Sequence, residues 1–62
     1  MVIMEKFRIK RIFTDGSHNF KTLHLFMCLS MAVRAARANA ECFGVSKVDL
    51  YQGTKLVATF YH

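Results

Sequence analysis

Hydrophobic and polar residues alternate along the first third of the chain, which is the pattern of a β-strand with one buried face. Residues 7–13 read Phe-Arg-Ile-Lys-Arg-Ile-Phe, and Asp15-Gly16 follows them after one residue. An Asp-Gly pair between two apolar runs favours a β-hairpin. We therefore predict a hairpin over residues 5–27, with the return strand running from Phe20 to about residue 27.

The loop length sets the register of this hairpin. A three-residue loop with Gly16 in the left-handed conformation pairs Phe7 with Leu23. One face then carries Phe7, Ile9 and Leu23, and the other carries Lys6, Arg8 and Lys10. A register shifted by one residue would exchange the faces of the second strand, whose mixed pattern leaves this alternative open.

The middle of the chain changes to a helical period. Apolar residues recur at spacings of four and three, which predicts an amphipathic helix over residues 30–43 with Ser30 as its N-cap and Gly44 ending it. The stripe expected to face the sheet is Leu29, Val33, Ala36, Ala40 and Phe43. The solvent side is expected to carry Arg34, Arg37, Ala38 and Glu41.

Alternation returns in the last third and predicts a second hairpin over residues 45–61, turning at residues 51–54. With a three-residue loop the core face carries Val48, Leu50, Leu56, Ala58 and Phe60. The opposite face carries Lys47, Asp49, Tyr51, Lys55, Val57, Thr59 and Tyr61. This register also places Asp49 directly opposite Lys55, as a cross-strand pair of opposite charge.

Together these elements predict one α+β domain over residues 1–62 with the order ββαββ. We expect a four-stranded antiparallel sheet with one helix packed on one face; the pattern does not set the strand order. One helix cannot cover both faces of the sheet. We therefore expect binding to use the uncovered face or the arginine side of the helix.

Size and composition narrow the classes of function. The chain has 62 residues, of which 53% are hydrophobic, and this content excludes a disordered tail. A core this small contributes only about 3–5 kcal/mol to the net stability of the fold. A deep substrate pocket would remove part of that core. Only four residues are acidic, so few carboxylates are present that could act in catalysis. We expect no catalytic residues and no enzymatic activity.

Targeting signals and metal motifs are not apparent in the sequence. The longest apolar stretch, residues 25–33, is far shorter than the ~20 residues that span a bilayer, so a cytoplasmic protein without membrane contact is expected. Cys28 and Cys42 are expected to be reduced, partly buried thiols. His24 and Cys28 would lie ~13 Å apart on a strand, too far to share a metal or to form a catalytic pair. We expect no metal and no cofactor, and His62, the last residue, is expected to be mobile.

Positive charge is concentrated in the first 21 residues, within a net charge of +5. A basic sheet face with aromatic rings can neutralise phosphates and stack on bases. The alternative is a solvated face whose lysines protect the sheet from edge pairing. The nucleic-acid-binding candidates are Lys6, Arg8, Lys10, Arg11 and Lys21.

A protein partner is the other candidate. The residues expected to meet it are Tyr51, Val57 and Tyr61 on the uncovered face and Arg34 and Arg37 on the helix. A second apolar side of the helix, formed by Met31, Ala35 and Cys42, suggests a homodimer. The six phenylalanines are assigned to the core, because a small domain needs large rings to fill space.

Residues 7–17 resemble the first hairpin of small phage and prophage reading frames, and residues 32–60 are similar to them in layout. This resemblance implies an accessory protein that acts by binding a host macromolecule. We therefore expect a non-enzymatic protein that binds and modulates or inhibits a host protein in the host cytoplasm. A small basic nucleic-acid-binding protein is the alternative, and a structural or assembly subunit is the third reading.

Overall fold

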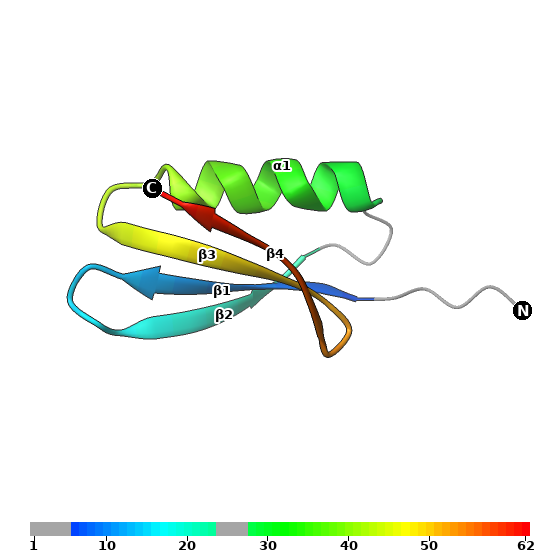
Figure 1. Cartoon of the computed structure of the whole chain (residues 1–62), viewed down its shortest axis with the longest axis horizontal. Helices are drawn as coiled ribbons and strands as arrows, with labels where there is room; N and C mark the ends of the chain where they lie inside the picture. The colour runs from blue at the N-terminus through cyan, green and yellow to red at the C-terminus, as the bar shows by residue number, and fades with distance from the viewer. Residues whose placement is uncertain (1–5, 24–27) are drawn as a thin grey trace, which may run out of the picture.

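The computed structural model describes residues 6–23 and 28–62. It shows an open four-stranded antiparallel sheet with one helix on one face (Figure 1), which confirms the predicted α+β fold and its ββαββ order. The elements are β1 (Phe7–Phe13), β2 (His18–Thr22), α1 (Leu29–Ala40), β3 (Val45–Gln52) and β4 (Lys55–Tyr61).

The strand order, β2-β1-β3-β4, joins the two hairpins along β1 and β3. These central strands supply the largest fully buried side chains, Ile9, Val48 and Leu50. The edge strand β2, in contrast, is exposed at all five positions. The two strands with the most apolar inner faces therefore pair at the centre, where the helix covers them.

The first hairpin has the register predicted from a three-residue loop. Arg8 lies opposite Thr22, and the Leu23 N–H donates to the Phe7 carbonyl at 2.8 Å. The loop closes where the Phe13 N–H donates to the Ser17 carbonyl at 2.8 Å, and Gly16 has a φ of 91°. β2 begins at His18, two residues earlier than predicted, while the predicted continuation over residues 24–27 lies outside the described residues.

The second hairpin corrects the predicted register. Gln52 lies opposite Lys55, so the loop contains two residues rather than three, and Gly53 carries the turn with a φ of 63°. A β-bulge beside Leu50 then leaves one extra residue on β4. The bulge shifts the pairing by one residue, and this keeps Ala58 and Phe60 on the helix side.

Two predictions from that register are therefore wrong. Asp49 lies opposite Thr59 and not opposite Lys55. Leu56 lies opposite Tyr51 on the uncovered face and is 50% exposed, whereas it was expected in the core. The cause is the tight turn at Gly53, because a turn shorter by one residue changes which β4 residues face each side.

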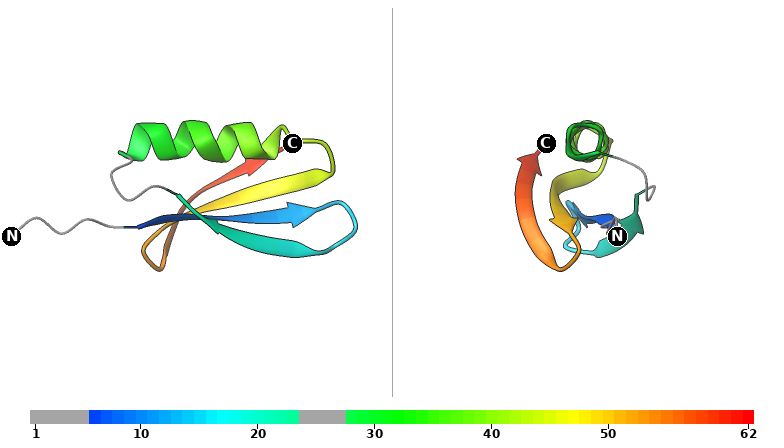
Figure 2. Two further views of the ribbon diagram at one scale, coloured as in Figure 1. Left: turned by 180° about the vertical axis from the view of Figure 1, so that it is seen from behind. Right: turned by 90° about the vertical axis from the view of Figure 1, so that its right-hand side faces the viewer.

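The helix lies inside the curl of the twisted sheet, as the end-on view in Figure 2 shows. Its buried stripe consists of Ala32, Ala36 and Ala40, whose small side chains let the helix approach the sheet closely. It begins at Leu29 with Cys28 as N-cap and ends at Ala40, three residues before the predicted end. Arg34, Arg37, Ala38 and Glu41 are exposed, as predicted.

The early end of the helix overturns part of the predicted stripe. Phe43 comes after the helix and is fully exposed, and Leu29 in the first turn is 49% exposed. Gly44, with a φ of 85°, directly precedes β3 and does not end the helix as predicted, because the helix already ends at Ala40. At the end of the chain, the His62 backbone N–H donates to the Ser46 carbonyl at 3.1 Å, and the His62 Nδ1 lies 2.7 Å from the Ala40 carbonyl oxygen.

Candidate nucleic-acid interface

The sheet face that the helix leaves uncovered, here called the open face, is built from three cross-strand rows. Directly opposite residues in antiparallel strands point to the same side, so each row follows from the pairing. Read from β2 to β4, the first row is Thr22, Arg8, Tyr51 and Leu56. The second row is Phe20, Lys10, Asp49 and Thr59. The third row is His18, Ile12, Lys47 and Tyr61.

Phe20 is the centre of an aromatic and basic group on this face. Its side chain is 48% exposed. The Arg8 guanidinium carbon lies 4.7 Å from the ring centroid, and the Lys10 ammonium nitrogen lies 5.8 Å from it. The His18 and Tyr51 rings lie at centroid distances of 6.1 and 6.5 Å. These five residues are called the Phe20 cluster below.

The first hairpin loop places this cluster. Its register sets Phe20 directly opposite Lys10, with Arg8 two residues away along β1. The Asp15 carboxylate supports the loop by accepting hydrogen bonds from the Ser17 hydroxyl and backbone N–H, at 2.6 and 2.8 Å. These bonds, with that of the Ser17 hydroxyl the strongest, lower the pKa of Asp15.

The Phe20 ring also leans across the sheet. Phe20 belongs to β2 and Tyr51 to β3, about 10 Å apart across the sheet and about 7 Å apart along it, so their backbones are about 12 Å apart. Their ring centroids are nevertheless only 6.5 Å apart. The two cations near the ring, Arg8 and Lys10, stabilise this position by about 0.5–1 kcal/mol each. The ring is therefore held in place while half of its surface stays open to solvent.

The chemistry of this arrangement suits an unpaired base on a charged backbone. An aromatic ring stacks on a base with a gain of about 1–3 kcal/mol, whichever base it is. A guanidinium group can stack on the same base or pair with a phosphate, and an ammonium group neutralises a phosphate. The Phe20 cluster places all three groups within reach of one nucleotide.

The predicted nucleic-acid residues separate into two groups in the structure. Arg8 and Lys10 belong to the Phe20 cluster, and the exposed Lys6 directly precedes β1. Arg11 and Lys21 lie on the opposite side of the sheet, by their places in the pairing. Arg11 donates from Nε to the Asn19 side-chain oxygen at 2.9 Å.

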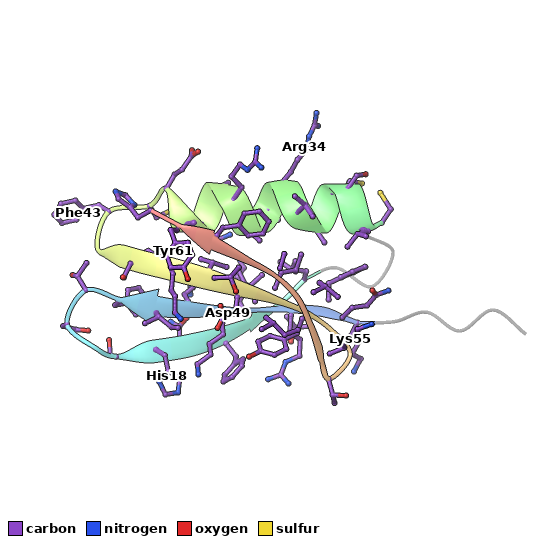
Figure 3. All side chains as sticks on the ribbon, viewed as in Figure 1. His18, Arg34, Phe43, Asp49, Lys55 and Tyr61 are labelled. Atoms are coloured by element: carbon purple, nitrogen blue, oxygen red, sulfur yellow. The ribbon has the colours of Figure 1, made fainter. Side chains whose placement is uncertain are left out.

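The predicted protein-binding residues are also divided. Tyr51 is half-buried in the Phe20 cluster, while Tyr61 and Val57 lie on β4 and are 75% and 36% exposed. Arg34 projects from α1 away from the sheet (Figure 3). Arg37 lies with its guanidinium carbon 5.7 Å from the Phe60 ring centroid. The helix arginines and the open face are thus two separate surfaces.

Phe20 is the site residue that the sequence reasoning missed. Residue type places Phe20 in the core with the other phenylalanines, whereas the predicted register places it opposite Lys10 on the basic face. That pairing was the available signal. Phe43, also assigned to the core, is fully exposed beyond the end of the helix and away from the Phe20 cluster (Figure 3).

The remaining chemistry-bearing groups do not form a second site. Cys28 and Cys42 are free and exposed rather than partly buried, and a hydrogen bond with the Ser30 hydroxyl at 3.2 Å lowers the pKa of Cys28. In the described part of the chain, no three His, Cys, Asp or Glu side chains are arranged to hold a metal ion. His24, the other member of the excluded pair, lies outside the described residues.

No protein-family model matches the chain, and no curated protein or solved structure gives a significant match. Within residues 6–23 and 28–62 no helix combines the length and apolar character that crossing a bilayer requires. The functional assignment therefore depends on the chemistry of the open face.

Proposed function

We propose that this protein binds single-stranded nucleic acid on the open face of its sheet. The observation that carries the proposal is the half-exposed Phe20 ring with Arg8 and Lys10 close to it. Phe20 stacks on an unpaired base, and the two cations neutralise the neighbouring phosphates. Tyr51 and His18 extend the aromatic surface around Phe20.

Exposure of Phe20 favours a ligand over a purely structural role. Burial of apolar surface stabilises a protein by about 25 cal/mol per Å², so a half-exposed phenylalanine forgoes much of that gain. A solvated edge strand needs no aromatic residue at this position, because charged or small polar residues protect an edge better. A base that stacks on the ring would supply the missing contact.

A single strand fits the cluster better than a duplex. The faces of bases inside a duplex are already stacked on each other, so an aromatic side chain reaches them only where the strand is unpaired. A duplex would meet the cations alone and would gain nothing from Phe20. We therefore expect tighter binding of single strands at equal salt.

Fluorescence anisotropy tests this proposal with labelled single-stranded RNA and DNA of about twelve nucleotides and with matched duplexes, at about 50 and 200 mM salt. We expect micromolar binding of the single strands that weakens at the higher salt, and weaker binding of the duplexes. No binding at the lower salt, or equal affinity for single strand and duplex, would contradict the proposal.

A protein partner is the second candidate function, and the exposed apolar residues of β4 favour it. Leu56, Val57 and Tyr61 are 50%, 36% and 75% exposed. Binding of a host protein through this strip, which the resemblance to phage proteins suggests, should depend little on salt. Tyr61→Asp should abolish it and leave nucleic-acid binding through Phe20 unchanged. Homodimerisation stays a prediction, which sedimentation equilibrium of the purified protein can test.

A further inference from the structure

Asp49 is the only buried charged residue in the described chain, at 9% exposure. It lies on the open face, in the same cross-strand row as Phe20, Lys10 and Thr59. Figure 3 shows its position near the middle of the sheet. A carboxylate at the centre of a basic face repels phosphate, so the proposed function leaves this residue unexplained.

The hydrogen bonds of Asp49 leave one carboxylate oxygen available. The Thr59 hydroxyl donates to Oδ1 at 2.9 Å, and within the described residues Oδ2 has no hydrogen-bond partner. Every fully buried side-chain nitrogen or oxygen in that part of the chain has a partner. Oδ2 is therefore not fully buried, although Asp49 as a whole is only 9% exposed.

The strand pairing places Asp49 on the same face as the aromatic rings of the Phe20 cluster. Asp49 lies two residues from Tyr51 on β3, about 7 Å along the strand and on the same face. The Phe20 ring leans toward Tyr51, so a base stacked on this pair of rings lies over β1 and β3. Its edge then falls beside Asp49, while the backbone follows Arg8 and Lys10.

An ionised carboxylate only accepts hydrogen bonds, so it selects base edges by their donors. Guanine presents two adjacent donors, N1–H and the N2 amino group. Uracil presents one donor between two carbonyl oxygens, and these oxygens are repelled by the carboxylate. Adenine and cytosine each present one amino group beside an acceptor nitrogen. Guanine is therefore the base that complements Asp49 best.

We propose that Asp49 makes this face prefer guanine in single-stranded nucleic acid. This inference rests on the proposed function and specifies the base that the site accepts. Phe20 supplies stacking that tolerates any base, and Asp49 adds the discrimination.

Competition binding tests the preference with short RNAs of uridine in which three isolated positions carry guanine, adenine, cytosine or uridine. We expect the guanine RNA to compete about tenfold better than the uridine RNA, which is the discrimination of a good charged hydrogen bond. Replacement of guanine by inosine, which lacks the N2 amino group, should remove much of this advantage. The inosine comparison needs no protein variant.

Asp49→Asn tests the residue itself. Asparagine keeps the size of the side chain and an oxygen for the Thr59 hydroxyl, so the variant should fold and still bind RNA without preferring guanine. Thr59→Val is the control, because it keeps the carboxylate and should retain the preference. Circular dichroism shows whether each variant is folded.

The outcomes separate this inference from the proposed function. Equal affinity for all four RNAs, or an unchanged guanine preference in folded Asp49→Asn, would overturn the inference and leave single-strand binding standing. No binding of any RNA would overturn both.

Discussion

Phe20 shows how one residue changes the interpretation of a face. Residue type alone assigns a phenylalanine to the core of a small domain, and this assignment is correct for the buried Phe7. Phe20 and Phe43 are exposed for different reasons: Phe20 because the register places it opposite Lys10, and Phe43 because the helix ends before it. The type of a residue predicts its burial only when its place in the strand or helix also points its side chain toward the core.

The charged residues can be tested individually through the salt dependence of binding. Arg8→Gln should lower the slope of log affinity against log salt by about 0.7, the contribution of one phosphate contact to a single strand. Arg34→Gln removes the same charge from the far side of the helix and should leave the slope nearly unchanged. Anisotropy titrations over a series of salt concentrations measure both slopes. Equal reductions in the two variants would show that net charge, and not the Phe20 cluster, drives binding.

At the scale of elements, the register of the first hairpin could be predicted from its sequence, whereas the register of the second could not. The Asp15-Gly16 turn determined the first register correctly, and with it the basic side of β1. The second hairpin follows a tight turn at Gly53 together with a bulge. The bulge restores the alternation of the apolar residues, so the pattern alone could not reveal that a residue had been inserted.

The helix was predicted in place but not in detail. Its alanines at positions 32, 36 and 40 form the buried stripe, whereas the larger apolar residues at 29 and 43 were expected to mark it. Apolar size is a poor guide here, because the sheet curls around the helix and leaves space only for small side chains. Close approach of backbone to backbone replaces the packing of large residues.

This close approach makes a prediction about stability. Ala36→Leu should destabilise the protein by about 1–3 kcal/mol, because the larger side chain has no space against the sheet. Ala38→Leu, on the exposed side of the same helix, should change stability by no more than about 0.5 kcal/mol. Urea unfolding followed by circular dichroism measures both. If the two variants were equally stable, the alanine stripe would not be the helix contact.

At the scale of the whole molecule, the strand order decides which residues meet. Both hairpins are amphipathic, and their patterns allow either strand of each to lie at the centre. The order β2-β1-β3-β4 brings Tyr51 into the neighbourhood of Phe20, although 30 residues separate them. A contact between two hairpins depends on packing across the sheet, which no local pattern encodes. The sequence therefore predicted the basic strand but not the aromatic cluster.

The same order divides the charge of the molecule. Arg8 and Lys10 lie in the Phe20 cluster, Arg11 and Lys21 on the other side of the sheet, and Arg34 on the far side of the helix. The net charge of +5 is thus spread over several surfaces, and among the described residues the Phe20 cluster is the one that combines two cations with an exposed aromatic ring. Binding of a single strand is expected to concentrate there.

The most direct test of single-strand binding on the open face compares Phe20→Leu with Phe43→Leu. Both changes replace an exposed phenylalanine by leucine, and only Phe20 lies in the cluster. We expect Phe20→Leu to bind single-stranded RNA about tenfold more weakly in anisotropy titrations, since stacking contributes about 1–3 kcal/mol per base, and Phe43→Leu to bind as the unaltered protein does. Unchanged affinity in folded Phe20→Leu, or an equal loss in both variants, would contradict binding through the Phe20 cluster.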